Sequence, residues 1–236
     1  MLTESEALER LAPVAVELLA RPSCDVAPDL LGLVLVRQTE AGPTAGRIVE
    51  VEAYDGQGDL ASHARAGRTL RTATMFGPPG RAYVYLVYGL HSCLNVVTDR
   101  DGTPGAVLIR ALEPVAGGQL MRQRRGDPRD PDVRLAAGPA RLCQALAIDR
   151  SLDGHDLTLR GALWLARAEA GDVQASRGPG IIAGPRVGVD YAGPDWASRP
   201  WRFGICDHPA LSRPFPPGPP VGSAAAEAPH RTEDIE

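Results

Sequence analysis

The order of apolar and polar positions along the chain predicts a sheet built from several short strands. Residues 31–37 form an apolar run rich in valine and leucine, as expected of a strand. Residues 49–54 alternate strictly between apolar and polar side chains, so the two kinds are expected on opposite faces of a second strand. The apolar face then carries Val49, Val51 and Ala53, and the polar face carries Glu50, Glu52 and Tyr54.

More strands are expected in the middle and later parts of the chain. Residues 82–97 contain two strand-like runs around Tyr88-Gly89, which predicts a β-hairpin. Residues 106–112 and 186–189 are two further candidate strands. A long loop with little apolar periodicity covers residues 55–80, and loops of that length are typically functional or disordered.

Helical spacing of apolar residues occurs in two stretches. In residues 4–20 it contains Pro13, which favours two short helices over one. Residues 137–148 are a second candidate, opened by Gly138-Pro139. Strands and helices in mixed order predict an α+β fold: a curved, largely antiparallel sheet with flanking helices and a protruding β-hairpin.

The length of 236 residues suits one sizeable domain, expected over residues 1–212. Residues 213–236 are rich in proline, glycine and alanine and then acidic, which predicts a disordered tail.

No stretch approaches the roughly 18 apolar residues of a membrane helix. The acidic start MLTESEALER does not resemble a secretory signal, and the four scattered cysteines indicate neither a zinc site nor disulfides.

Basic residues have an unusual composition and distribution. All 25 are arginine, which excludes mechanisms that need a lysine Schiff base. The net charge is −4, yet residues 60–98 contain no acidic residue and four arginines. A cationic middle in an acidic chain indicates a local site for a polyanion. The alternative is chance clustering of arginines on a solvated face.

Arg110 is a candidate ion-pair partner for the two strand glutamates. It lies within an otherwise apolar strand candidate, and a buried arginine needs a counter-charge, which Glu50 and Glu52 could supply. Two carboxylates that face one region can also serve as acid or base. Three interpretations stay open: an exposed strand face, a structural Glu–Arg pair, and a pair that holds a catalytic water.

The predicted hairpin is rich in tyrosine. Tyr83 and Tyr85 share one strand face, and Tyr88 falls at the turn. An exposed aromatic tip near arginines suits insertion between stacked bases, although Tyr83 and Tyr85 could instead be core and Tyr88 an ordinary turn residue.

The histidines lack metal-ligand spacing, and no nucleotide-binding or serine-hydrolase motif occurs, so neither a metal nor a cofactor is expected.

Seven segments together carry a resemblance to a known family. They are RIVEVEAYDG (47–56), ASH (61–63), MFGPPGRAYVYLVYG (75–89), CLNVVT (93–98), VLIRALEP (107–114), GPARLCQALAI (138–148) and RVGVDYAG (186–193). The chain resembles the alkyladenine (3-methyladenine) DNA glycosylases, the mammalian-type base excision enzymes that also have bacterial members. The similarity extends from about Pro28 to Ser212.

The resemblance implies three catalytic positions. In this family the glutamate of the E-A-Y triplet activates the attacking water, which points to Glu52. The arginine of the L-x-R-A-L-E-P strand helps to hold that water, here Arg110. The main-chain carbonyl of the valine in R-V-G-V, here Val187, is its third ligand.

The resemblance also implies a pocket for the base. Tyr54 and Tyr85 match the tyrosines that stack on the two faces of a flipped base, and His63 matches a histidine that lines the same pocket. Asn95 stands near the exocyclic position that separates adenine from guanine. Tyr88 matches the tyrosine that intercalates where the nucleotide leaves the stack.

The chain departs from the family pattern in two places. Thr69-Leu70-Arg71-Thr72 stands where T-P-R-N is common, which leaves loop geometry and lesion preference open. Arg141 replaces a common lysine and keeps a charge that binds phosphate. Arg71 and Arg141 are the expected contacts to the DNA backbone.

The expected function is therefore base excision repair. The resemblance implies a monomeric cytoplasmic enzyme at the bacterial nucleoid that hydrolyses N-glycosyl bonds of alkylated or deaminated purines in double-stranded DNA. It implies no metal, cofactor or membrane, and the absence of lysine fits a monofunctional glycosylase. Two alternatives are a non-catalytic nucleic-acid-binding module and a nucleoside hydrolase.

Overall fold

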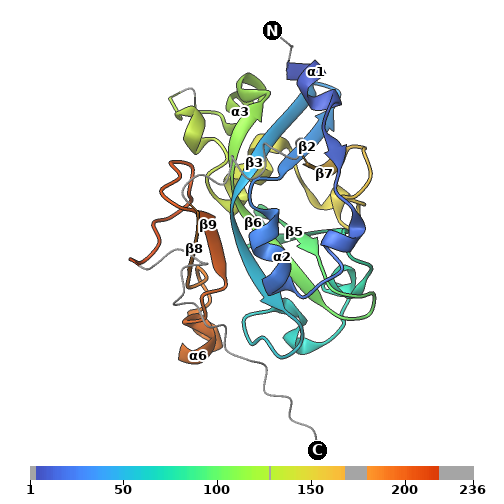
Figure 1. The fold of residues 1–236 in the computed structure, drawn as a ribbon, viewed down its shortest axis with the longest axis vertical. Coiled ribbons are helices and arrows are strands. Elements are labelled where there is room, and N and C mark those ends of the chain that lie inside the picture. Colours follow the sequence, from blue (N-terminus) through green and yellow to red (C-terminus); the bar gives the residue numbers. More distant parts are fainter. Residues whose placement is uncertain (1–3, 128, 168–179, 218–236) are drawn as a thin grey trace, which may run out of the picture.

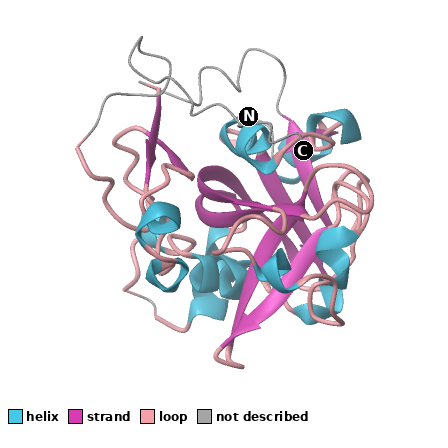
Figure 2. Cartoon of the chain, turned by 90° about the horizontal axis from the view of Figure 1, so that it is seen from below, coloured by secondary structure: helices cyan, strands magenta, loops and turns pink. Residues whose placement is uncertain are grey.

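In the described part of the chain, nine strands pair into one sheet, and short helices lie around it (Figures 1 and 2). The computed structural model describes residues 4–127, 129–167 and 180–217. The strands are β1 (Ala12–Pro13), β2 (Val34–Thr39), β3 (Gly42–Asp55), β4 (Ala82–Val87), β5 (His91–Val97), β6 (Gly105–Ala116), β7 (Leu163–Arg167), β8 (Ile181–Gly184) and β9 (Arg202–Ile205). The α-helices are α1 (Glu4–Glu9), α2 (Ser23–Leu30), α3 (Gly118–Arg125), α4 (Pro139–Leu146) and α6 (Pro194–Ala197).

Every strand pairing in the described part of the chain is antiparallel. Neighbouring strands follow the order β1-β7-β2-β3-β6-β5-β4, and β8 pairs with β9, which in turn pairs with β3. The expected α+β fold with an antiparallel sheet is confirmed.

The long strand β3 organises the sheet. Its first half pairs with β2, whereas Glu50–Glu52 pair with β9. Strand β6 pairs with β3 along most of its length, with register shifts around Glu50. The sheet therefore divides at the two glutamates, and β9 brings a late part of the chain beside them (Figure 1).

The predicted alternation in β3 is confirmed by burial. Val49, Val51 and Ala53 are fully buried in the largest hydrophobic core, which also takes side chains from α2 and α4. A buried valine or leucine contributes roughly 1.5–3 kcal/mol relative to an exposed one. Helix α4 starts with Pro139, whose missing N–H costs no bond within the first turn, and is followed by Ala147, which caps it in a left-handed conformation. This core holds β3 in place.

Most predicted elements occur, with shifted ends. The hairpin over residues 82–97 is confirmed as β4 and β5, and the helix predicted at residues 137–148 is α4. The strand predicted at residues 31–37 starts later, at Val34, and the one predicted at residues 106–112 is part of the longer β6.

Two predicted elements are wrong. Residues 186–189 form no strand; β8 ends just before, because Pro185 offers no N–H and Gly188 has a positive φ of 76°. Among the described residues 4–20, α1 is the only α-helix. Pro13 lies in the short strand β1, which pairs with β7, and a 3-10 turn follows at Val16–Leu18.

The loop over residues 55–80 and residues 214–215 contact the sheet. The loop contains 3-10 turns at His63–Ala66 and Ala73–Phe76, and buried side chains from both pack with Tyr83. Phe215 belongs to the tail that was predicted to be disordered, and its ring centroid lies 3.7 Å from the Arg202 guanidinium of β9. Residues 218–236 of that prediction lie outside the described residues. None of the described helices is long and apolar enough to cross a membrane.

Candidate active site

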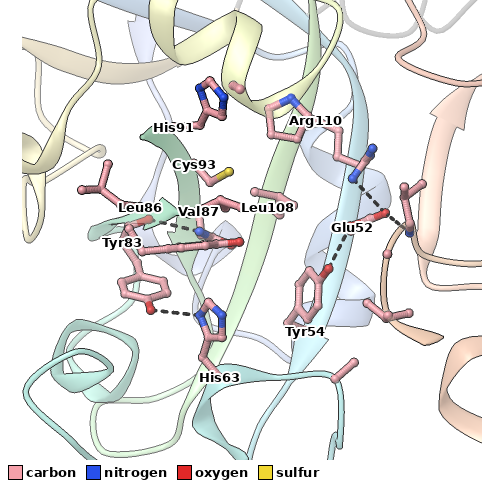
Figure 3. A pocket seen from close by; sticks show the side chains of 18 of the residues that line it. Glu52, Tyr54, His63, Tyr83, Leu86, Val87, His91, Cys93, Leu108 and Arg110 are labelled. Atoms are coloured by element: carbon pink, nitrogen blue, oxygen red, sulfur yellow. Dashed lines mark hydrogen bonds and ion pairs between the residues drawn. The ribbon is translucent and has the colours of Figure 1, made fainter. Parts of the chain in front are cut away.

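A cavity of about 700 Å³ is lined by the last part of β3, the β4–β5 hairpin and the loop that follows β8. Figure 3 shows Glu52, Tyr54 and Arg110 on one wall and His63 and Tyr83 on the opposite wall. Glu52 is the only acidic residue among the described residues that line the cavity. A space of this size accommodates a small organic group such as a purine.

Directly paired residues of four adjacent strands form part of the cavity lining. Glu52 on β3 is opposite Leu108 on β6, and Leu108 is opposite Asn95 on β5. Asn95 is opposite Tyr83 on β4, and its side-chain nitrogen donates to the Tyr83 carbonyl over 3.1 Å. Since opposite residues of paired strands project to one face, sheet register brings these four side chains to the cavity.

Three donors hold the fully buried Glu52 carboxylate. The Val187 N–H donates to Oε1 over 2.7 Å, and Arg110 Nη1 lies 3.2 Å from the same oxygen. The Tyr54 hydroxyl donates to Oε2 over 2.9 Å. These contacts fix the orientation of the carboxylate at the cavity wall.

Glu50 is also fully buried, but it does not line the cavity. Its Oε1 accepts from Arg110 Nε over 2.9 Å and from the Ser212 hydroxyl over 2.8 Å. The interpretation of an exposed strand face is therefore wrong for both glutamates. An ion pair with Arg110 is confirmed for Glu50, whereas Glu52, which also contacts Arg110, lines the cavity.

Arg110 reaches both carboxylates because it lies at an irregularity of the sheet. Glu50 is opposite Ala111 and Val51 is opposite Ile109, so Arg110 between them has no partner in the register. Burial disfavours its charge, but Glu52 and Glu50 together raise the pKa of Arg110 above its ordinary value. The guanidinium therefore stays charged between the two glutamates.

Tyr54 lies between the cavity and a buried ion pair. Burial raises the pKa of its hydroxyl well above the ordinary value, and the Glu52 carboxylate adds to this, so the hydroxyl remains a donor. The Arg186 guanidinium lies 4.8 Å from the centroid of the Tyr54 ring. Arg186 Nη2 donates to Asp59 Oδ1 over 2.9 Å, and both side chains are fully buried.

The opposite wall is aromatic. Tyr83 and Tyr85 stack with ring centroids 5.5 Å apart, and the His63 ring meets Tyr85 edge-on at 4.5 Å. The Tyr83 hydroxyl lies 3.1 Å from His63 Nδ1, and Arg71 Nη2 lies 3.4 Å from Nε2. Because arginine only donates, we assign the His63 proton to Nδ1.

His63 is neutral over the physiological pH range. Burial is the main cause that lowers its pKa to about 4, and the charges of Arg71 and Arg65 lower it further.

We expect Arg71→Gln to raise the pKa of His63 towards, but not up to, the ordinary 6.5, because burial persists. An NMR titration of the His63 ring measures it, with Arg81→Gln as the control. An unchanged value in Arg71→Gln would exclude the charge of Arg71 as a cause.

Tyr88 is at the hairpin tip. Its side chain is 92% exposed, and its φ of 52° lies in the left-handed region, as does that of the following Gly89. It lines the rim of the cavity together with residues of the strands. Tyr88 is thus not a core residue, and the ring is free to meet a partner.

The two arginines expected at the DNA backbone have different surroundings. Arg71 lines the cavity, with its guanidinium 5.7 Å from the centroid of the Tyr85 ring. Arg141 lies on α4, where Nη1 is 3.3 Å from Asp130 Oδ2 and donates to the Arg134 carbonyl. A phosphate contact of Arg141 would have to compete with Asp130.

Sequence reasoning missed several residues around the cavity. Cys93 lines it and is opposite Tyr85 in the hairpin; its place two residues before Asn95 was a usable signal, because such positions share a strand face. Asp59 and Arg186 gave no local signal. They are 127 positions apart and meet only in the folded chain.

Among the described residues, no group of three or more potential ligands could hold a metal ion.

Comparison with known proteins identifies the family of this chain. The family model described as methylpurine-DNA glycosylase matches residues 17–209. The chain belongs to this family. A candidate 3-methyladenine DNA glycosylase of Methanocella arvoryzae is 50% identical over 196 residues, which are 83% of this chain and 94% of the relative. The DNA-3-methyladenine glycosylase of Homo sapiens is 43% identical over 211 residues, which are 86% of this chain and 68% of the human protein.

Membership of the methylpurine-DNA glycosylase family gives the activity. The protein is a DNA-repair enzyme of the 3-methyladenine DNA glycosylase type, which hydrolyses N-glycosyl bonds, and DNA is its substrate. The resemblance seen in the sequence is confirmed. The roles of individual residues in the cavity remain predictions.

Proposed function

We propose that this glycosylase releases alkylated or deaminated purines from double-stranded DNA after the damaged nucleotide has flipped into the cavity. One observation carries the proposal: a single carboxylate, Glu52, is held by three donors at the wall of an aromatic cavity. The enzyme is further proposed to act as a monomer, with a single domain over residues 1–212.

Glu52 is the proposed general base. Breaking an N-glycosyl bond develops positive charge on the sugar, and a carboxylate beside that carbon stabilises it and accepts a proton from the attacking water. Arg110 holds the carboxylate and helps to position the water. The Val187 N–H orients Glu52; the water contact of the Val187 carbonyl stays a prediction.

The aromatic walls are the proposed binding site for the base. Tyr54 and Tyr85 both line the cavity, and stacking of a base on their rings would contribute about 1–3 kcal/mol for each contact. His63 and Asn95 line the same space, and neutral His63 adds no charge beside a base made cationic by alkylation. Tyr88 fills the gap that the flipped nucleotide leaves.

Base release from defined duplexes tests the proposal. Each duplex carries one lesion (3-methyladenine, 7-methylguanine, hypoxanthine or ethenoadenine), and the released base is measured under single-turnover conditions. Release of at least one base supports the proposal. Binding without release would favour a nucleic-acid-binding module, and release only from free nucleosides would favour a nucleoside hydrolase.

We expect DNA binding to weaken steeply with salt despite the acidic net charge. Arg65, Arg68 and Arg71 are exposed in the acid-free segment beside the cavity, whereas Arg81 is paired with Asp156. Three phosphate contacts would give a slope of log affinity against log salt of about −2.7, because counterions are released. Titrations of fluorescent duplex between low and physiological salt measure the slope.

Single substitutions test which arginines contact the DNA phosphates. Arg68→Gln should reduce the slope by about 1, whereas Arg47→Gln, which is paired with Glu113 outside the cavity lining, should leave it unchanged. A flat salt dependence of the unmodified protein would contradict a basic DNA-binding face on this loop.

A further inference from the structure

The buried pair Asp59–Arg186 lies directly behind the cavity wall. Neither residue lines the cavity. Arg186 also donates to the Ala53 carbonyl over 3.0 Å, and Asp59 accepts from the Ala61 N–H over 2.9 Å. The pair therefore joins β3, the loop that carries His63 and the segment that carries Val187, and neither charge is free to move.

Arg186 is the member of the pair that faces the tyrosine. Its guanidinium carbon lies 4.8 Å from the Tyr54 ring centroid and 4.9 Å from the Trp201 ring centroid. Its charge also lowers the pKa of the Tyr54 hydroxyl, against the larger effect of burial. The Tyr54 ring is thus the layer between a fixed cation and the cavity.

A cation on one face of an aromatic ring attracts the electron density of that ring. The other face then attracts a second cation less strongly, while a neutral base stacked there is affected less. Burial of the pair away from water increases the range of its field. Methylation at N7 makes guanine cationic, whereas deamination of adenine gives the neutral base hypoxanthine.

We propose that the Asp59–Arg186 pair, acting through the Tyr54 ring, is a specificity determinant that limits the preference of the enzyme for cationic over neutral damaged bases. This inference rests on the proposed function, because it assumes that the base stacks on Tyr54. Arg186 reduces the attraction for a cationic base, and Asp59 keeps that reduction moderate. Both residues are positioning residues that do not touch the substrate.

Two single substitutions separate this role from a structural one. The measured quantity is the ratio of single-turnover excision rates for 7-methylguanine and hypoxanthine, each in duplex DNA. Arg186→Gln leaves Asp59 without its partner cation and should raise the ratio about 3- to 10-fold. Asp59→Asn leaves Arg186 without its partner anion and should lower it by a similar factor. A merely structural pair would not move the ratio in opposite directions.

A double variant keeps the test decisive if the single variants do not fold, since each buries an uncompensated charge. Asp59→Asn with Arg186→Gln buries no charge, and circular dichroism reports its folding. Its ratio should exceed that of the unmodified protein but remain below that of Arg186→Gln. Arg47→Gln, on the same strand as Tyr54 but outside the cavity lining, is the matched control and should leave the ratio unchanged.

The outcomes distinguish the two proposals. If the unmodified protein releases neither base nor any other lesion, the proposed function fails. If it releases both bases and the ratio is unchanged in the folded double variant, or moves in one direction in both single variants, the role of Asp59–Arg186 is overturned.

Discussion

Glu52→Gln slows base excision by about 10²- to 10⁴-fold, while the affinity for lesion-bearing duplex changes little. The amide keeps the shape of the carboxylate and its oxygen still accepts from the Val187 N–H, but it cannot take a proton from water. Single-turnover release of hypoxanthine gives the rate, and titration of a fluorescent duplex gives the affinity. Excision at a near-normal rate would remove Glu52 from the role of general base.

Glu50→Gln is the matched control, two residues away on the same strand face. Glu50 is bound to Arg110 and Ser212 and does not line the cavity. Breaking a buried ion pair costs about 3–5 kcal/mol, so this variant should lose free energy of unfolding in a denaturant titration. Glu52→Gln also breaks an ion pair with Arg110, so the excision rate separates the two variants: only Glu52→Gln should lower it strongly. If Glu50→Gln abolishes excision in a protein of unchanged stability, Glu50 becomes the candidate base.

Tyr88→Ser slows excision from a stable base pair about 10- to 100-fold and hardly affects single-stranded or mismatched DNA. The ring offsets the cost of unstacking only where there is stacking to lose. Because Tyr88 is 92% exposed, the free energy of unfolding should change by no more than about 0.5 kcal/mol. Excision rates on paired, mismatched and single-stranded substrates of one sequence measure the effect.

Tyr85→Ser provides the contrast. Tyr85 lines the cavity and packs against His63 and Tyr83, so it is needed whether or not the strand is paired. Its loss should slow excision from paired and unpaired DNA to similar degrees. Equal losses on the two substrates for Tyr88→Ser would place its role in the pocket and not in the duplex.

Local pattern was enough to predict the framework of the site. Strict alternation placed Glu50 and Glu52 on one face of β3, and the two strand-like runs around Tyr88 predicted the hairpin, because both depend on near neighbours in sequence. The strand predicted at residues 186–189 is wrong, since valines at alternate positions do not compensate for Pro185 and a glycine with positive φ.

What distinguishes the two glutamates could not be predicted from local pattern. Ser212 engages Glu50 and Val187 engages Glu52, and both come from segments far along the chain. Arg110 reaches both carboxylates only because the register of β3 and β6 shifts there. The choice of Glu52 over Glu50 came from resemblance, and the pair Asp59–Arg186 was missed because nothing near either residue signals the other.

The junction of β3 with β9 has a consequence for synthesis on the ribosome. In a growing chain Val187 follows Glu52 by 135 residues, and Ser212 follows Glu50 by 162 residues. Domains form as their segments leave the ribosome, from the N-terminal side onwards. The nascent sheet therefore holds two acidic side chains whose later partners have not yet been made, and the Glu52 carboxylate acquires its fixed orientation only after the segment with Val187 has left the ribosome.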